Sequence, residues 1–195
     1  MASITASLSR TAGWVVIVVW FIVRIGAVRA EGSQLELAVK ATYLYKLAPF
    51  VEWPNPAAEF PGNVFPICIA GRDPFGAVLD RAVSGQSVAG HPIVVRRYQV
   101  ITGNPGCAVV YITGSDTEPA AVILAALHAA PVLTVTDQDF DPKVKGIINF
   151  VVRDNRVRFQ IDEATAAEDG LTISSKLLSL AVSVRQRPPS ATAPR

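Results

Sequence analysis

The two histidines are the candidate catalytic bases, because an activated serine or cysteine nucleophile needs a base beside it. His91 lies in the segment Gly90-His91-Pro92, and His128 ends an alanine-rich segment. Neither lies near a Gly-x-Ser-x-Gly turn, and the sequence contains no such turn. Ser175 and Lys176 are adjacent on an expected helix, so their side chains diverge and do not form a serine–lysine pair. These residues indicate a protein that is not an enzyme.

The alternating acids Asp137, Asp139 and Asp141 follow the pattern of the first half of a calcium-binding loop. The second half does not fit this pattern. Pro142 takes the place of the glycine that makes the sharp turn, and Ile148 takes the place of the bidentate glutamate. We therefore expect a solvated acidic loop, with neither a metal ion nor another cofactor.

Two further loops, at residues 71–76 and 113–116, follow short apolar segments and precede segments that favour helix. Loops at the carboxyl ends of parallel strands often bind ligands, and backbone N–H groups at a helix start suit a small anion. Neither loop has the Lys-Ser/Thr of a phosphate loop or the third glycine of a dinucleotide site. The simpler interpretation of both loops is an ordinary turn whose backbone N–H groups are capped by side chains of the protein. A small-ligand-binding or sensor module is kept as the alternative function.

Residues 1–30 have the pattern of a secretory signal peptide. Arg10 precedes an apolar run from Trp14 to Val23, and Val28-Arg29-Ala30 provides a small-residue cleavage site. The apolar run covers about twelve residues at most, whereas a membrane-spanning helix needs roughly twenty, so a retained anchor is the less favoured alternative. We expect cleavage after Ala30 and a periplasmic protein.

Export changes how the charge and the cysteines are interpreted. The first thirty residues hold three arginines and no acid, so the formal charge of +2 becomes −1 in the mature chain, with 15 basic and 16 acidic residues. Phosphate backbones require clustered basic residues, so we expect no nucleic-acid partner. Cys68 and Cys107 would both meet an oxidising compartment, where a pair of thiols in one exported domain is more often bridged than free.

The first predicted element is a helix over residues 34–51, with apolar residues at nearly every heptad position. Only a narrow polar stripe remains, through Glu36, Lys40 and Tyr43. A surface helix normally has one apolar face of moderate width, so this helix should be covered on more than one side. It is either deeply buried in the domain or also contacts a partner, and a homodimer remains open.

The following elements alternate between strand and helix. Apolar strands are expected at 64–70, 107–112 and 131–135, with a further strand at 93–98 and helices at 74–83 and 117–129. This alternation indicates βαβ units and a mostly parallel sheet covered on both faces. A two-residue turn, Asp154-Asn155, joins two later strands into a hairpin, followed by short helices at 162–170 and 174–184.

The predicted fold class is therefore α/β. It is a three-layer single domain, residues 31–184, with a mixed, mostly parallel sheet flanked by helices and a late antiparallel hairpin. A proline-containing tail, residues 185–195, is expected to be disordered.

Six phrases stand out along the chain. They are Ala41-Thr42-Tyr43-Leu44-Tyr45-Lys46-Leu47-Ala48-Pro49-Phe50-Val51-Glu52-Trp53-Pro54, Gly71-Arg72-Asp73-Pro74-Phe75-Gly76, Leu133-Thr134-Val135-Thr136-Asp137, Gly146-Ile147-Ile148-Asn149-Phe150-Val151, Val157-Arg158-Phe159-Gln160-Ile161 and Gly170-Leu171-Thr172-Ile173-Ser174-Ser175-Lys176-Leu177-Leu178. They occur in the order found in the YfiR-like family, and the chain resembles that family from about Val39 to Val184.

The resemblance implies a periplasmic regulator that binds the periplasmic region of a membrane diguanylate cyclase and represses it. An outer-membrane lipoprotein is the implied second partner, and cyclic-di-GMP and biofilm formation would rise when repression is lifted. The resemblance also implies a disulfide between Cys68 and Cys107 that joins neighbouring strands. The best-known repressor has a second cysteine pair, but residues 143–150 contain no cysteine, which excludes redox regulation through that pair.

We expect partner contacts first at Phe50 and Trp53 and then at Leu171 and Ile173. Aromatic side chains next to proline can serve as rigid anchors at a protein interface. The alternative is that all four side chains belong to the core.

Overall fold

A computed structural model describes residues 33–55 and 61–187. The predicted signal peptide and residues 188–195 of the predicted tail lie outside the described residues. The chain divides into a unit of residues 1–36, whose described residues are helical, and a second unit from Leu37 to Arg195. None of the helices in the described ranges is long and apolar enough to cross a membrane.

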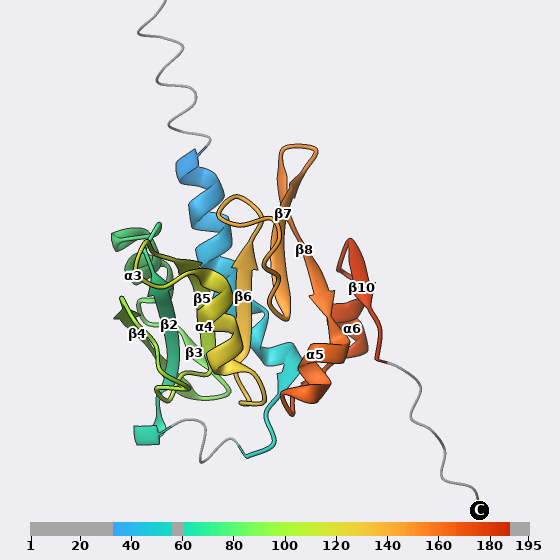
Figure 1. Ribbon diagram of the computed structural model, residues 1–195. Coiled ribbons are helices and arrows are strands. Elements are labelled where there is room, and N and C mark those ends of the chain that lie inside the picture. Colours follow the sequence, from blue (N-terminus) through green and yellow to red (C-terminus); the bar gives the residue numbers. More distant parts are fainter. Residues whose placement is uncertain (1–32, 56–60, 188–195) are drawn as a thin grey trace, which may run out of the picture. The chain divides into compact units, whose positions relative to one another are not determined.

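The second unit contains an eight-stranded sheet with the strand order β10-β8-β7-β6-β5-β2-β4-β3 (Figure 1). Its strands are β2 (Phe65–Gly71), β3 (Ser87–Val88), β4 (His91–Tyr98), β5 (Val109–Gly114), β6 (Leu133–Asp137), β7 (Ile148–Arg153), β8 (Arg156–Asp162) and β10 (Ser183–Arg185). Neighbours pair in parallel except β7 with β8 and β3 with β4. The predicted mixed, mostly parallel sheet is confirmed.

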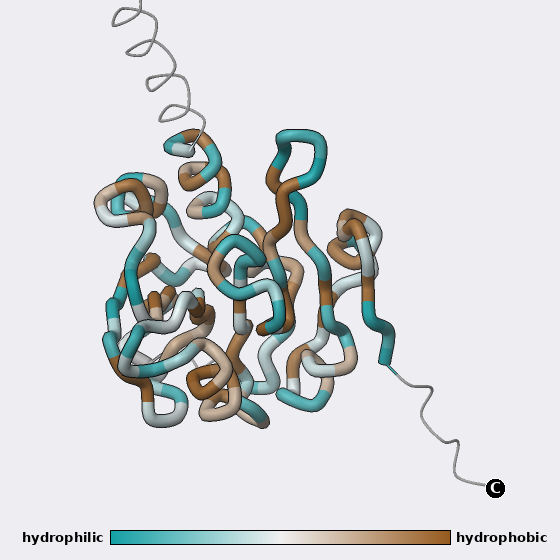
Figure 2. Tube along the Cα trace, turned by 45° about the horizontal axis from the view of Figure 1, so that its top comes forward, coloured by the Kyte–Doolittle hydropathy of each residue, from teal (hydrophilic) through white to brown (hydrophobic). Residues whose placement is uncertain are grey.

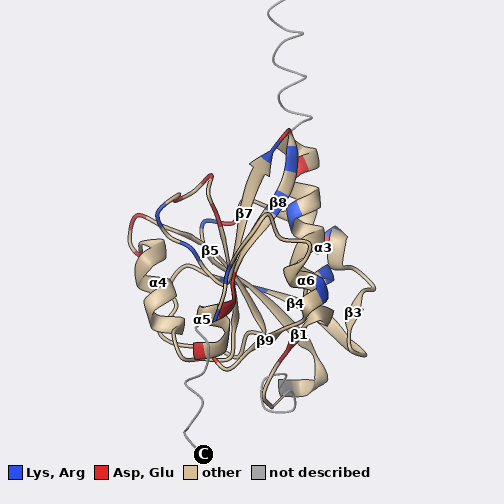
Figure 3. Cartoon of the chain, turned by 90° about the vertical axis from the view of Figure 1, so that its right-hand side faces the viewer, with Lys and Arg blue, Asp and Glu red and all other residues tan. Residues whose placement is uncertain are grey.

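Helices cover both faces of the sheet, as Figure 3 shows with α4 and α5 on one side and α3 and α6 on the other. Their bounds are α3 (Ala77–Val83), α4 (Ala120–Leu127), α5 (Glu163–Glu168) and α6 (Ser175–Leu178). The first helix, residues 33–46, packs from residue 37 onward in the same apolar cluster as α3 and α6. A second cluster lies beneath α4 and contains the side chains of Ile123 and Leu127. The domain therefore has the predicted three layers.

The first helix is shorter than predicted, and its buried residues lie from Lys40 onward. It ends at residue 46, because Pro49 cannot donate within a helix and disfavours helical geometry at Ala48. The turn η1 (Ala48–Phe50) and the strand β1 (Val51–Glu52) follow. Part of the polar stripe is covered as well, since Lys40 is buried and the ring of Tyr43 lies 6.0 Å from those of both Phe150 and Phe159, whereas Glu36 is half-buried.

The central strands β2, β5 and β6 are buried at every residue, as expected for parallel strands covered on both faces. Their carboxyl ends meet closely at one point. Gly71 has φ +99°, and a Cβ built on it would lie 2.3 Å from the carbonyl oxygen of Gly114. Glycine is therefore required where β2 ends beside β5.

The late hairpin is confirmed, with the turn residues Asp154 and Asn155 at φ 50° and 57°. Positive φ at both positions is typical of the type I′ turn that matches the twist of a hairpin. Figure 2 shows this tip as hydrophilic. Along β8, Val157, Phe159 and Ile161 are buried and alternate with more exposed polar residues, so one face meets the core as predicted.

The last part of the chain differs from the predicted helix over 174–184. Only α6 is helical, with the side chain of Ser174 accepting a hydrogen bond from the N–H of Leu177. The chain then enters β10, whose parallel pairing with β8 places the predicted boundary at residue 184 inside a strand. Two- and three-residue strands leave no readable alternation, so sequence reasoning missed β1, β3, β9 (Thr172–Ile173) and β10.

Candidate functional site

The four residues predicted to contact a partner lie in or next to one small antiparallel ribbon made by β1 and β9. Val51 pairs with Ile173 and Glu52 pairs with Thr172. The N–H of Ser174 donates to the carbonyl of Phe50 over 2.9 Å, which extends the ribbon by one hydrogen bond. The ribbon thus joins the two segments that were predicted to contact a partner, which lie about 120 residues apart in the chain.

The four side chains differ in burial. Trp53, Leu171 and Ile173 are 9%, 1% and 6% exposed and belong to the main apolar cluster. The indole of Trp53 meets the ring of Phe65 edge-on, with ring centroids 5.8 Å apart. Phe50 is only partly buried, and its ring lies 5.6 Å from the ammonium of Lys176. Phe50 is therefore the member of the group that a partner can reach without displacing the core.

A groove of about 510 Å³ runs beside this ribbon. Its lining is mostly apolar and consists of Ala48, Pro49, Val51, Glu52, Trp53, Phe65, Val88, Ala89 and His91. Glu52 and Thr172, on the ribbon itself, are exposed. We call this surface, formed by Phe50, Glu52, Thr172, Lys176 and the groove, the ribbon surface. It has an aromatic and apolar centre with the charged residues at its edge, which matches the apolar core and polar rim of a protein interface.

The two strand-end loops considered for anion binding use their backbone donors internally. The carboxylate of Asp73 accepts the N–H of Phe75 over 2.8 Å, and the N–H of Arg72 donates to the carbonyl of Gly114. In the second loop the hydroxyl of Ser115 accepts the N–H of Glu118. A carboxylate of the protein therefore already occupies the position that an external anion would take in the first loop, and the turns are capped as the simpler interpretation predicts.

Asp73 also has a cationic partner that shifts its pKa. The Nε of Arg97 donates to Asp73 over 2.6 Å, and the Nη2 of Arg97 donates to Asp80. Burial raises the pKa of Asp73, but the hydrogen bonds from Arg97 and from the N–H groups of Phe75 and Gly76 lower it by more. The pKa of Asp73 therefore lies below its usual value.

This lowered pKa gives a pH-dependent contribution to stability. The Asp73 carboxylate stabilises the folded state above its unfolded-state pKa of about 3.9, and the contribution is lost as the pH falls through the lower folded-state pKa. We expect Asp73→Asn to lower the free energy of unfolding by about 1 kcal/mol near neutral pH, and by progressively less below about pH 4. Urea titrations at several pH values measure this difference. A difference that stays constant down to pH 2 would contradict the assigned role.

The predicted solvated acidic loop needs a correction. Asp137 and Lys40 are paired within the protein, with side chains only 1% and 3% exposed and 2.5 Å between the Lys40 ammonium and the carboxylate. The hydroxyl of Tyr111 donates to the same carboxylate over 3.0 Å, and the half-exposed Asp139 lies 2.8 Å from Lys40. The available sequence signal was a lysine on the narrow polar stripe of a helix expected to be covered on more than one side, because a buried cation requires a buried anion.

The histidines lie in different surroundings. His91 lines the groove of the ribbon surface, and the Nδ1 of His128 is 3.1 Å from the buried carboxylate of Asp169. Burial raises the pKa of Asp169, and this is only partly offset by hydrogen bonds from the N–H of Ala129 and from His128. Because the Ala129 contact is 2.7 Å long, Asp169 holds the end of α4 against α5. The contact between His128 and Asp169 therefore has a structural role.

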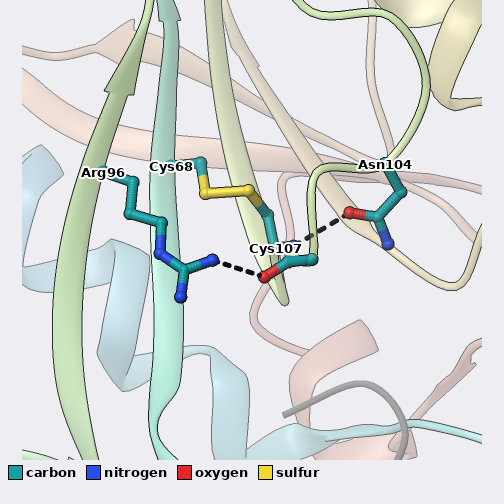
Figure 4. Close-up of a disulfide and its surroundings, with 5 residues drawn as sticks. Cys68, Arg96, Asn104 and Cys107 are labelled. Atoms are coloured by element: carbon teal, nitrogen blue, oxygen red, sulfur yellow. Dashed lines mark hydrogen bonds between the residues drawn. A yellow bond between two sulfur atoms is a disulfide. The ribbon is translucent and has the colours of Figure 1, made fainter. Parts of the chain in front are cut away.

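The disulfide between Cys68 and Cys107 is present, and both cysteines are fully buried (Figure 4). Cys68 lies on β2, and Cys107 stands two residues before β5, so the bridge links neighbouring parallel strands as the resemblance implied. The side chain of Asn104 accepts the N–H of Cys107 over 2.8 Å, and Arg96 donates to the carbonyl of Gly106. A disulfide in this position indicates folding in an oxidising compartment.

These features define a small, disulfide-bonded α/β domain whose main candidate site is a protein-binding surface. The YfiR/HmsC-like family model matches residues 37–182, which is most of the chain, and the chain belongs to this family. The match covers all six phrases that carried the resemblance. No curated protein is found to match the chain.

Proposed function

We propose that this protein is a periplasmic, non-enzymatic regulator that binds the periplasmic region of a membrane diguanylate cyclase and represses it. The family match over residues 37–182 carries the proposal, since characterised members of the family repress diguanylate cyclases. The signal-peptide pattern of residues 1–30 and the Cys68–Cys107 disulfide support a periplasmic location. Binding of an outer-membrane lipoprotein is the proposed means by which repression is lifted.

We place the contact with the cyclase on the ribbon surface. Phe50 is the proposed anchor, because an aromatic ring with little rotamer freedom gives contact area at low entropic cost. Trp53, Leu171 and Ile173 support this contact from the core, since Ile173 belongs to the ribbon, Trp53 and Leu171 adjoin it, and all three side chains are buried in the main apolar cluster. Lys176, 5.6 Å from the Phe50 ring, adds a positive charge at the edge of the anchor.

Photocrosslinking in living cells tests this placement. A benzophenone amino acid replaces Phe50 in one variant and Phe140 in another, because Phe140 is a second partly exposed phenylalanine on a distant loop. We expect the variant at position 50 to yield a crosslink to a membrane diguanylate cyclase and the variant at position 140 to yield none. The same cyclase crosslinked equally from both positions would contradict the ribbon surface as the contact.

Substituting Phe50 by aspartate gives a functional prediction. The charge should disrupt an apolar anchor, so cellular cyclic-di-GMP should rise to the level of a deletion strain. Because Phe50 is only partly buried, the free energy of unfolding should fall by no more than about 2 kcal/mol, and the purified variant should remain folded. Phe140→Asp provides the matched control and should still repress. Full repression by a folded Phe50→Asp variant would show that Phe50 is not part of the interface.

The groove beside Trp53 supports a second candidate function, a small-ligand-binding or sensor module. Its volume of about 510 Å³ and its mostly apolar lining are within the range of small-molecule sites. Mass spectrometry of the solution released on denaturing the purified protein tests this function. A stoichiometric metabolite would support it, and a ligand-free protein that still represses the cyclase would contradict it.

A further inference from the structure

A row of basic side chains lies on the outer face of the β7–β8 hairpin, away from the ribbon. The register pairs Arg153 with Arg156 and Val151 with Arg158. The two residues of a pair point to the same face of the sheet, and successive pairs alternate between the two faces. The pair of Phe150 and Phe159 lies on the other face and contributes to the main core. The three arginines therefore share the face opposite the first helix, and Figure 3 shows basic positions gathered on this hairpin.

Two lysines continue this row in the loop that precedes β7. Lys145 lines a polar cavity of about 200 Å³ together with Asn149 and Gln160, which lie on the arginine face of the hairpin. Lys143 and Lys145 also line a larger groove against α4. From Gln160 to Arg156 the strand advances about 13 Å. The five basic residues thus lie along one side of the hairpin, and we call this group, Lys143, Lys145, Arg153, Arg156 and Arg158, the cationic face.

These five side chains are exposed, and none makes a hydrogen bond or ion pair with another described residue. The acids nearby are engaged elsewhere or lie at the tip. Asp162 pairs with Arg185, Asp141 accepts the backbone N–H of Lys143, and Asp154 is in the hairpin turn. Like charges placed directly opposite each other, as at Arg153 and Arg156, destabilise a hairpin. An external anion would relieve this repulsion.

The groove next to the two lysines is mostly apolar, unlike the cationic face. Its volume is about 610 Å³, and its floor is formed by small and apolar side chains, Ala121, Leu124 and Ala125 of α4 with Val144 opposite. The only carboxylate in the lining, Asp169, is buried and already hydrogen-bonded to Ala129 and paired with His128. The surface therefore places an apolar recess beside a run of unpaired cations.

We propose that the cationic face and the α4 groove together bind an acidic segment of a protein partner, with carboxylates on the arginines and one apolar side chain in the groove. Arginine on a rigid strand suits carboxylates, because its planar fork can donate two parallel hydrogen bonds. A protein segment fits better than a lipid surface, since a flat layer of headgroups cannot fill a recess of about 610 Å³. The site is separate from the ribbon surface and does not depend on the proposed repression.

Fluorescence anisotropy at 150 mM NaCl tests this site on the purified exported protein. The probe is a labelled twelve-residue peptide of glutamate and serine with one central leucine. We expect R153Q/R156Q/R158Q to weaken peptide binding by about tenfold, since each exposed charge pair contributes modestly. The matched control R72Q/R81Q/R187Q removes the same charge from exposed arginines elsewhere and should change the affinity less than about twofold.

Two further measurements separate the parts of the proposal. Replacing the central leucine of the peptide by serine should weaken binding about threefold or more, because the groove then loses its apolar occupant. Vesicles of phosphatidylglycerol and phosphatidylcholine should bind less than the peptide does. The proposal is overturned if both triple variants weaken binding equally, if the leucine makes no difference, or if the vesicles bind and the peptide does not.

Discussion

Replacing Cys68 and Cys107 together by alanine should lower the free energy of unfolding by about 4 kcal/mol, because the bridge closes a loop with a sequence separation of 39. For a domain of this size the melting temperature should fall by about 10 °C. The buried position of both sulfurs adds to this effect, since two small cavities remain in the layer beneath α4.

Calorimetry of the wild type and the double variant under non-reducing conditions measures this effect. Alanine at both positions avoids a free thiol that could form intermolecular bridges. The wild type unfolded with reductant present should approach the variant in stability. Equal melting temperatures for the oxidised wild type and the variant would show that the bridge does not stabilise the domain.

Replacing Lys40 by methionine should lower the free energy of unfolding by about 3–5 kcal/mol, because the substitution leaves the buried carboxylate of Asp137 without its cation. Methionine fills a similar volume, so the loss reports charge rather than packing. Lys46→Met, at an exposed lysine of the same helix, is the matched control and should change stability by less than about 1 kcal/mol.

The double variant Lys40→Met/Asp137→Asn separates the ion pair from other effects of the substitution. Asparagine keeps an oxygen that can accept the N–H of Asp139, a contact of 3.0 Å, and removes the uncompensated charge. We expect it to recover at least half of the lost stability. Denaturant titrations of the wild type, the single variants Lys40→Met and Asp137→Asn, and the double variant give the coupling energy. A double variant as unstable as Lys40→Met alone would contradict a paired charge.

Local patterns predicted most of the fold. Asp154-Asn155 between two apolar strands predicted the hairpin, because few residue pairs accept positive φ at both turn positions. Alternating strands and helices predicted the layers, and the presence of two cysteines in a chain predicted to be exported predicted the disulfide. In each case the deciding interaction is either local or restricted to two residues.

The sequence could not show contacts that depend on distant partners. Lys40 lies on a polar stripe, and only the fold places it 2.5 Å from Asp137, which is 97 positions away. The same limit applies to Phe50 and Leu171, since their shared ribbon depends on two-residue strands. The net charge of −1 for residues 31–195 also concealed the cationic face, because the compensating acids lie elsewhere.

Cellular cyclic-di-GMP tests the proposed repression most directly. The measurement compares a deletion strain with the same strain that expresses either the full chain or a version lacking residues 1–30. We expect cyclic-di-GMP to rise on deletion and to return to the original level only with the full chain. An unchanged level on deletion, or equal correction by the version that lacks residues 1–30, would contradict repression from the periplasm.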